Sequence, residues 1–303
     1  MVNYRNILVG LDLTGMDPFL IRYAAFFANV MNSRKIIFLH VIQAYDIPEE
    51  KRDKIRDIYN SLKEHLNKEI KQHLGSVPDK MEIKVDVKIE DRDVSEVIIK
   101  NVRRHKIDLT VLGKKADSQR AELYSARTIA LSESDMLLVP ADPPDTIERV
   151  MAAVDLNKES NKGVKMAHWI GRYTNAKLFG QFIFSQNKSF FPFSFENQQD
   201  YVQKLAEKKI KQFKKNHWVL AHDLDWILHG ADNYHEQTKK IIQSAEEKNA
   251  DIIILAAKGR TSSNSTLLGM VAEGLRKQKS NKPVLIMKNR FEKNSFFNIF
   301  LQG

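Results

Sequence analysis

The chain has 303 residues, of which 43% are hydrophobic and 28% are charged, and its formal net charge is +10. This composition is typical of a globular protein, and the length predicts about two domains. The chain has no cysteine, which excludes disulfides, thiolate nucleophiles and cysteine-bound metals. It has no run of about 18 apolar residues, so we expect no membrane insertion. No signal-peptide pattern precedes the first predicted strand, which favours a cytoplasmic location.

The first half alternates short runs of Ile, Val and Leu with longer stretches of helical periodicity. This alternation predicts βαβ units around a parallel sheet. Strands are predicted at 5–13, 34–42, 82–90, 107–113 and 136–140, and helices at 17–32, 48–75, 93–105 and 125–133. Asp17 and Pro18 are expected to open the first helix as its cap and its N1 proline.

The second half follows the same plan. Strands are predicted at 148–156, 176–184, 219–229, 250–257 and 283–288, and helices at 160–173, 197–215, 234–249 and 267–280. The apolar strands show little alternation, which is typical of strands covered on both faces. We therefore predict an α/β fold of two five-stranded parallel sheets, each with helices on both faces.

Two matched segments indicate that the halves are duplicates. Residues 7–13 resemble 150–156, and residues 107–113 resemble 250–256. Both pairs are offset by 143 residues, so that Asp12 corresponds to Asp155 and Asp108 to Asp251. We predict domains at 1–142 and 147–290, a proline-containing linker between them and a C-terminal tail at 291–303.

The richest chemical pattern follows the fourth strand of the second half. The strand ending near Ala256 enters a loop of Gly, Ser, Thr and Asn residues, and a helix is predicted after it. Small residues let backbone N–H groups approach an anion, and a helix N-terminus favours negative charge. Asp155 ends the first strand of this half and is expected at the same crevice, because open α/β sheets bind ligands beyond the carboxyl ends of their strands. Neither a Rossmann nor a P-loop motif is present.

These features resemble the universal stress protein (UspA) family over essentially the whole chain, as a tandem pair extending to about residue 290. The resemblance implies the adenine nucleotide alpha hydrolase-like fold. Nucleotide-binding members carry G-x2-G-x9-G-[ST] after the fourth strand. This pattern falls on Ala256, Gly259, Gly269 and Met270, so that two of its three glycines are kept.

The resemblance also implies a ligand, which is ATP accompanied by Mg²⁺. It places Asp155 and the backbone near Ile183 at the adenosine. It places Gly259, Gly269 and Val271 at the phosphates, with Met270 where the family has a hydroxyl. Members of the family commonly dimerise through their fifth strands, and a tandem chain can form this pair internally or form a homodimer as well.

The first copy departs further from the pattern. Gly113 begins its loop, and no other glycine occurs before Pro140. The offset between the copies grows from 143 to 147 residues by the fifth strand, so the first copy is shorter here. We predict that the first domain has lost the phosphate site although it keeps Asp12. For both Asp12 and Asp155, capping of a local turn is the alternative to ligand binding.

Three other features favour structural roles. The histidines at 217, 222, 229 and 235 lack metal-ligand spacing, and His222 alternates with Leu224, Trp226 and Leu228 as in a packed strand. The basic stretch 208–215 is typical of a solvated helix face. The aromatic loop 189–195 favours packing at an interface.

The resemblance implies a role in stress response, and because no catalytic set is visible, we favour a binding or signalling module over an enzyme. One alternative is a protein-interaction module in which both nucleotide sites are degenerate. Another is a weak ATPase or autophosphorylating protein. Nucleic-acid binding is the least favoured interpretation of the positive charge, because no arginine cluster or interleaved aromatic residues accompany it.

Overall fold

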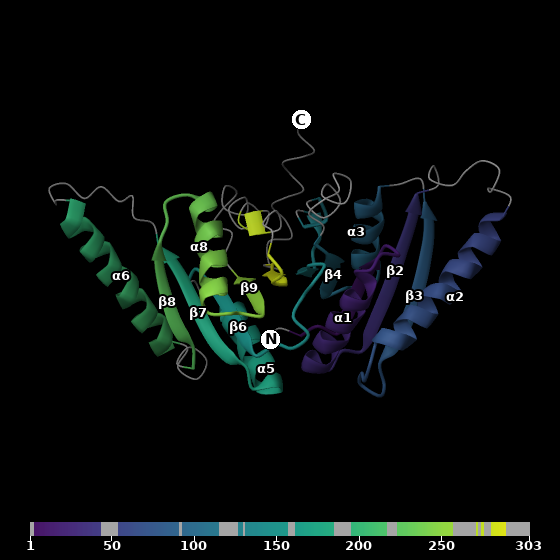
Figure 1. Cartoon of the computed structure of the whole chain (residues 1–303), viewed down its shortest axis with the longest axis horizontal. Helices are drawn as coiled ribbons and strands as arrows, with labels where there is room; N and C mark the ends of the chain where they lie inside the picture. Colours follow the sequence, from purple (N-terminus) through teal and green to yellow (C-terminus); the bar gives the residue numbers. More distant parts are fainter. Residues whose placement is uncertain are drawn as a thin grey trace. The chain divides into compact units, whose positions relative to one another are not determined.

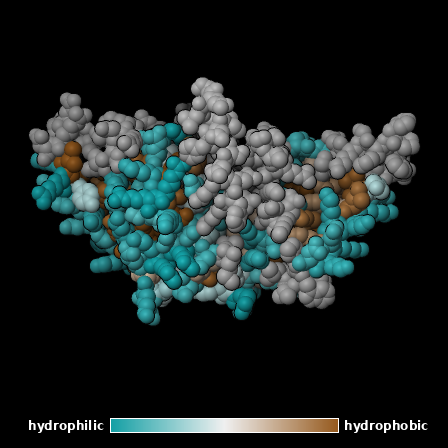
Figure 2. Space-filling view, turned by 180° about the vertical axis from the view of Figure 1, so that it is seen from behind, coloured by the Kyte–Doolittle hydropathy of each residue, from teal (hydrophilic) through white to brown (hydrophobic). Residues whose placement is uncertain are grey.

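The computed structural model describes residues 3–43, 54–90, 93–114, 127–129, 131–156, 161–184, 195–216, 223–256, 271, 274–275 and 280–288. The chain divides into two compact units, Met1–Pro143 and Pro144–Gly303. Among the described helices, none is long and apolar enough to cross a membrane. The face drawn in Figure 2 is mostly hydrophilic over the described residues, with small brown patches between them.

The first unit contains a parallel sheet with the strand order β3-β2-β1-β4-β5. Its strands are β1 (Asn6–Leu11), β2 (Lys35–Gln43), β3 (Glu82–Glu90), β4 (Leu109–Gly113) and β5 (Asp135–Val139). Its helices are α1 (Asp17–Met31), α2 (Ile55–His73) and α3 (Val94–Arg104), seen on the right of Figure 1. Because crossovers between parallel strands are right-handed, α1 and α2 cover one face and α3 the other.

The second unit has the corresponding order β8-β7-β6-β9-β10. Its strands are β6 (Arg149–Val154), β7 (Lys177–Phe184), β8 (Asp225–Gly230), β9 (Ile252–Ala256) and β10 (Val284–Met287). Its helices are α5 (Asn161–Thr174), α6 (Phe195–Asn216) and α8 (Tyr234–Glu247). Phe182 packs against Ala206 of α6, whereas its neighbour Gln181 donates hydrogen bonds to α8. Helices therefore cover both faces, and the predicted fold class is confirmed.

Some predicted boundaries differ from the structure. The strand predicted at 219–229 begins at Asp225, so Leu224 precedes it, and residues 217–222 lie outside the described part of the chain. Of the helix predicted at 125–133, residues 127–129 and 131 are described as helical. Of the helix predicted at 267–280, the same holds for residues 271 and 274–275. The loop 189–195 is described only at its last residue, and the tail 291–303 is outside the described residues.

The duplicated Asp108 and Asp251 have the same structural task. Asp108 accepts hydrogen bonds through Oδ2 from the backbone N–H groups of Arg5 and Asn6, at 2.8 and 3.0 Å. Asp251 accepts through Oδ2 from the N–H groups of Glu148 and Arg149, both at 2.8 Å. Each carboxylate thus ties the chain before the fourth strand to the start of the first strand. Part of the sequence repeat therefore preserves architecture.

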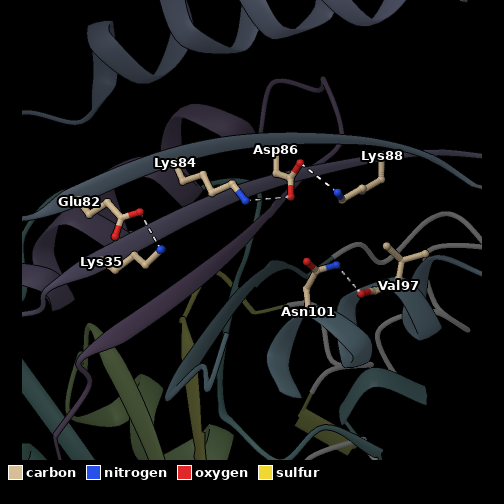
Figure 3. A network of polar contacts seen from close by, with 7 residues as sticks. All are labelled: Lys35, Glu82, Lys84, Asp86, Lys88, Val97 and Asn101. Atoms are coloured by element: carbon tan, nitrogen blue, oxygen red, sulfur yellow. Dashed lines mark hydrogen bonds and ion pairs between the residues drawn. The ribbon is translucent and has the colours of Figure 1, made fainter. Parts of the chain in front are cut away.

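The edge strand β3 carries a row of charged side chains (Figure 3). Asp86 lies between Lys84 and Lys88, with ion-pair distances of 3.6 and 3.3 Å. Lys35 of β2 pairs with Glu82 at 2.7 Å. Charged side chains on an edge strand discourage pairing with another chain. These charged side chains therefore suit β3 to its position at the edge of the sheet.

Candidate functional site

The strand order of the second unit reverses at β6, which lies between β7 and β9. Val154, the last residue of β6, is the register partner of Ala256, the last residue of β9. Asp155 follows Val154 and is partly buried. The structure thus brings Asp155 and Ala256 to the carboxyl ends of neighbouring strands. Ligands of open α/β sheets bind at this kind of switch point.

Of the other predicted site residues, the structure describes Ile183 and Val271. Ile183 lies near the carboxyl end of β7, opposite His229 of β8. Val271 is helical and buried. Gly259, Gly269 and Met270 lie outside the described residues. The described part of the predicted site is therefore Asp155, Ile183, Val271 and the end of β9.

Gly163 in the first turns of α5 was missed by the sequence analysis. A Cβ atom at this position would lie 2.6 Å from the Cβ of Ala256 and 3.4 Å from Cγ1 of Val154. These are the last residues of β9 and β6. The glycine therefore lets α5 approach the ends of both switch-point strands. A small residue at a helix start, facing two apolar strands, is the signal that could have revealed it.

Gly274 marks a second close contact that the sequence analysis did not identify. A Cβ atom there would lie 2.6 Å from Oγ1 of Thr238 in α8. By the 147-residue offset, Arg127 occupies this position in the first unit. Arg127 instead forms ion pairs with Glu96 and Asp93, at 2.9 and 3.7 Å. The two units therefore hold the segment after their fourth strands by different means.

In the first unit, the loop after β1 is stabilised by the chain's own side chains. Thr14 donates its hydroxyl hydrogen bond to Asp12 Oδ1 at 2.6 Å. The backbone N–H groups of Asp12 and Leu13 donate to the carboxylate of Asp17, at 3.2 and 3.0 Å. Asp17 was predicted to cap α1 and Pro18 to be its first helical residue, but the N-cap is Met16 and the first helical residue is Asp17. This prediction was wrong, because the buried Asp17 side chain turns back to the loop.

Met16 covers the end of β4 in the first unit. A Cβ atom at Gly113 would lie 3.0 Å from Cε of Met16, whose side chain is buried. A thioether side chain thus packs against the last residue of β4, after which the resemblance would place a phosphate loop. Residues 115–126 of the following loop lie outside the described residues.

His40 lies in the second half of β2, and its Nδ1 lies 2.9 Å from the carbonyl oxygen of Leu11. Burial lowers the pKa of His40 below its ordinary value of 6.5, although the hydrogen bond to Leu11 and the charge of Asp12 act in the opposite direction. The folded protein therefore binds a proton at this site less readily than the unfolded chain does.

We expect the free energy of unfolding to fall as the pH drops below about 6.5, because the unfolded chain takes up the proton first. His40→Asn, which keeps an amide donor near Leu11, is expected to flatten this pH dependence. Urea unfolding followed by far-UV circular dichroism at several pH values measures it. His65→Asn on the exposed face of α2 is the control. An equal pH dependence in wild type and His40→Asn would contradict the prediction.

Of the histidines that the sequence analysis considered as metal ligands, His229 and His235 lie within the described residues. Nδ1 of His229 lies 3.2 Å from Ser244 Oγ and 3.4 Å from Gln181 Nε2. Burial and the charge of Lys240 lower the pKa of His229. His235 lies in α8, whereas 217 and 222 are outside the described residues. Within the described ranges, no group of three or more His, Asp or Glu side chains could hold a metal ion.

Comparison with known proteins identifies the family. The model of the universal stress protein family matches residues 3–129. Universal stress protein A of Buchnera aphidicola subsp. Baizongia pistaciae is 30% identical over 151 residues, which cover 46% of this chain and 99% of that protein.

Solved structures agree on the fold. A universal stress protein from Archaeoglobus fulgidus has a TM-score of 0.64 and 15% identity, over 95% of this chain and 97% of its own. A functionally unknown protein from Pseudomonas aeruginosa PAO1 has a TM-score of 0.65 and 14% identity, over 95% and 93%. Because the 30% identity to the Buchnera protein extends over nearly the whole length of that protein, this chain belongs to the universal stress protein family.

Proposed function

We propose that the second unit binds an adenine nucleotide and that the protein acts in the cytoplasm as a binding or signalling module in stress response. One observation carries the proposal. Asp155 and Ala256 stand at the carboxyl ends of β6 and β9, where the strand order reverses. A carboxylate at this point can accept hydrogen bonds from a ribose or a base, and the loop after β9 begins beside it.

The difference between the units supports the second as the binding unit. In the first unit, Met16 covers Gly113, and the N–H groups of Asp12 and Leu13 donate to Asp17. The glycines of the phosphate motif, Gly259 and Gly269, occur in the second unit. Mg²⁺ would arrive with the phosphates, because proteins commonly hold it through substrate phosphates and only one or two carboxylates.

The experiment is a calorimetric titration of the chain with ATP and magnesium. We expect one site per chain and, for Asp155→Ala, an affinity about tenfold lower, because the variant loses a charge-assisted hydrogen bond. Asp12→Ala is the matched control in the first unit and is expected to bind like the wild type. Equal weakening by both variants would contradict the assignment to the second unit.

A protein-interaction module without nucleotide is the second candidate. Ala256 and Met270 favour it, since they replace a glycine and a hydroxyl residue of the motif. Absence of heat with ATP and with adenosine at high protein concentration would support this candidate. Transfer of label from γ-labelled ATP to phosphate or to the protein would instead reveal hydrolysis or autophosphorylation.

A further inference from the structure

Lys162 brings a positive charge to the carboxyl edge of the second sheet. Its Nζ donates a hydrogen bond to the carbonyl oxygen of Lys288, at 3.3 Å. Lys288 directly follows Met287, the last residue of β10, and Met287 is the register partner of Ala256. The ammonium group therefore lies at the same edge of the sheet as the end of β9, where the next loop begins.

The neighbouring Gly163 fixes this position. Because Gly163 packs against Ala256 and Val154, the first turn of α5 is held against the ends of β9 and β6. Lys162 precedes Gly163 in the chain and is partly buried. A charge at this depth is screened less by salt than one on a fully exposed side chain.

The first unit has no basic residue at the corresponding sequence position. The 143-residue offset relates Lys162 to Phe19, whose ring lies 5.1 Å from the guanidinium carbon of Arg22. A phenyl ring provides no hydrogen-bond donor for a phosphate. A basic residue at this sequence position is thus found in the unit that also keeps the glycines at 259 and 269.

We propose that Lys162 is an anion-binding residue of the second unit's site and makes it prefer phosphorylated over unphosphorylated nucleosides. This inference rests on the proposed function. The ammonium group has three donors on a flexible stem, so it can turn from the Lys288 carbonyl to a phosphate oxygen. A charge-assisted bond to phosphate is stronger than the bond to a neutral carbonyl.

The test compares adenosine with ATP and magnesium in calorimetric titrations. Lys162→Met is expected to weaken ATP binding by about tenfold or more and to leave adenosine binding unchanged. Lys162→Arg keeps the charge and is expected to retain most of the ATP affinity. Lys165→Met removes the same charge from α5, three residues further on, and is expected to bind both compounds like the wild type.

The outcomes separate the two proposals. If Lys162→Met and Lys165→Met bind ATP equally well, the assignment of Lys162 is wrong while nucleotide binding stands. If Lys162→Met weakens adenosine and ATP equally, Lys162 has only a structural role and the assignment is also wrong. If the wild type binds neither compound, the proposed function fails and the assignment fails with it. Tryptophan fluorescence of each variant checks that the second unit is folded.

Discussion

Gly163→Val is expected to destabilise the second unit by about 1–3 kcal/mol, since overpacking of a well-packed core typically costs this much. The added Cβ would lie 2.6 Å from the Cβ of Ala256, and a Cβ cannot rotate away from its own backbone. Val154 and Ile254 lie at 3.4 and 3.6 Å, so there is little room for the valine methyl groups. Valine has a somewhat higher helix propensity than glycine, and the steric contact outweighs this gain.

The tryptophans make this measurement specific. The chain has three, Trp169, Trp218 and Trp226, and all fall within the unit Pro144–Gly303. Urea unfolding followed by tryptophan fluorescence therefore reports on the second unit. Arg172→Val is the control, because it places the same residue type at an exposed position of α5 in the same unit. A wild-type urea midpoint for Gly163→Val would show that α5 does not pack tightly on β6 and β9.

Strand positions were predictable where apolar runs and flanking polar residues agree. The strand predicted at 82–90 is observed as Glu82–Glu90. The strand predicted at 5–13 stops at Leu11, and Leu13 adopts a φ of 61°. The cause is the contact of the Asp17 carboxylate with the N–H groups of Asp12 and Leu13. A contact of this kind depends on how α1 sits after the loop, which hydrophobic periodicity does not encode.

The candidate site was predictable in its topology and not in its packing. Once the strand order is known, the ends of β6 and β9 bring Asp155 and Ala256 together. Gly163 and Lys162 were overlooked, because both look like ordinary residues of an amphipathic helix. Their significance comes from distances to Ala256 and to the Lys288 carbonyl, which connect segments about 90 to 130 residues apart.

The duplicated aspartates show why a repeated residue does not by itself indicate a ligand site. Asp12 and Asp155 recur at one offset, and so do Asp108 and Asp251. The second pair holds backbone N–H groups at the start of β1 and β6, at the opposite edge from the candidate site. Duplication preserves aspartates of the candidate site as well as aspartates that hold the fold. The two kinds are distinguished by the edge of the sheet at which each lies.

Asp251→Ala is therefore expected to lower the free energy of unfolding of the second unit by about 1–2 kcal/mol. The variant removes one carboxylate oxygen that accepts from two backbone N–H groups, both at 2.8 Å. Water can reach these groups, so the loss is smaller than at a fully buried site. Tryptophan fluorescence during urea unfolding measures it.

Two variants make the result of Asp251→Ala decisive. Asp225→Ala removes a carboxylate of the same unit whose ion pair with Lys177 is well exposed, and such pairs contribute at most about 1 kcal/mol. Asp108→Ala removes the matching contact of the first unit, so it should change the circular dichroism transition more than the fluorescence transition. If Asp251→Ala and Asp225→Ala shift the fluorescence midpoint equally, the loss reflects a change of charge. A larger shift for Asp251→Ala means that this carboxylate fastens β6 to the chain before β9, and that the repeat kept it for this purpose.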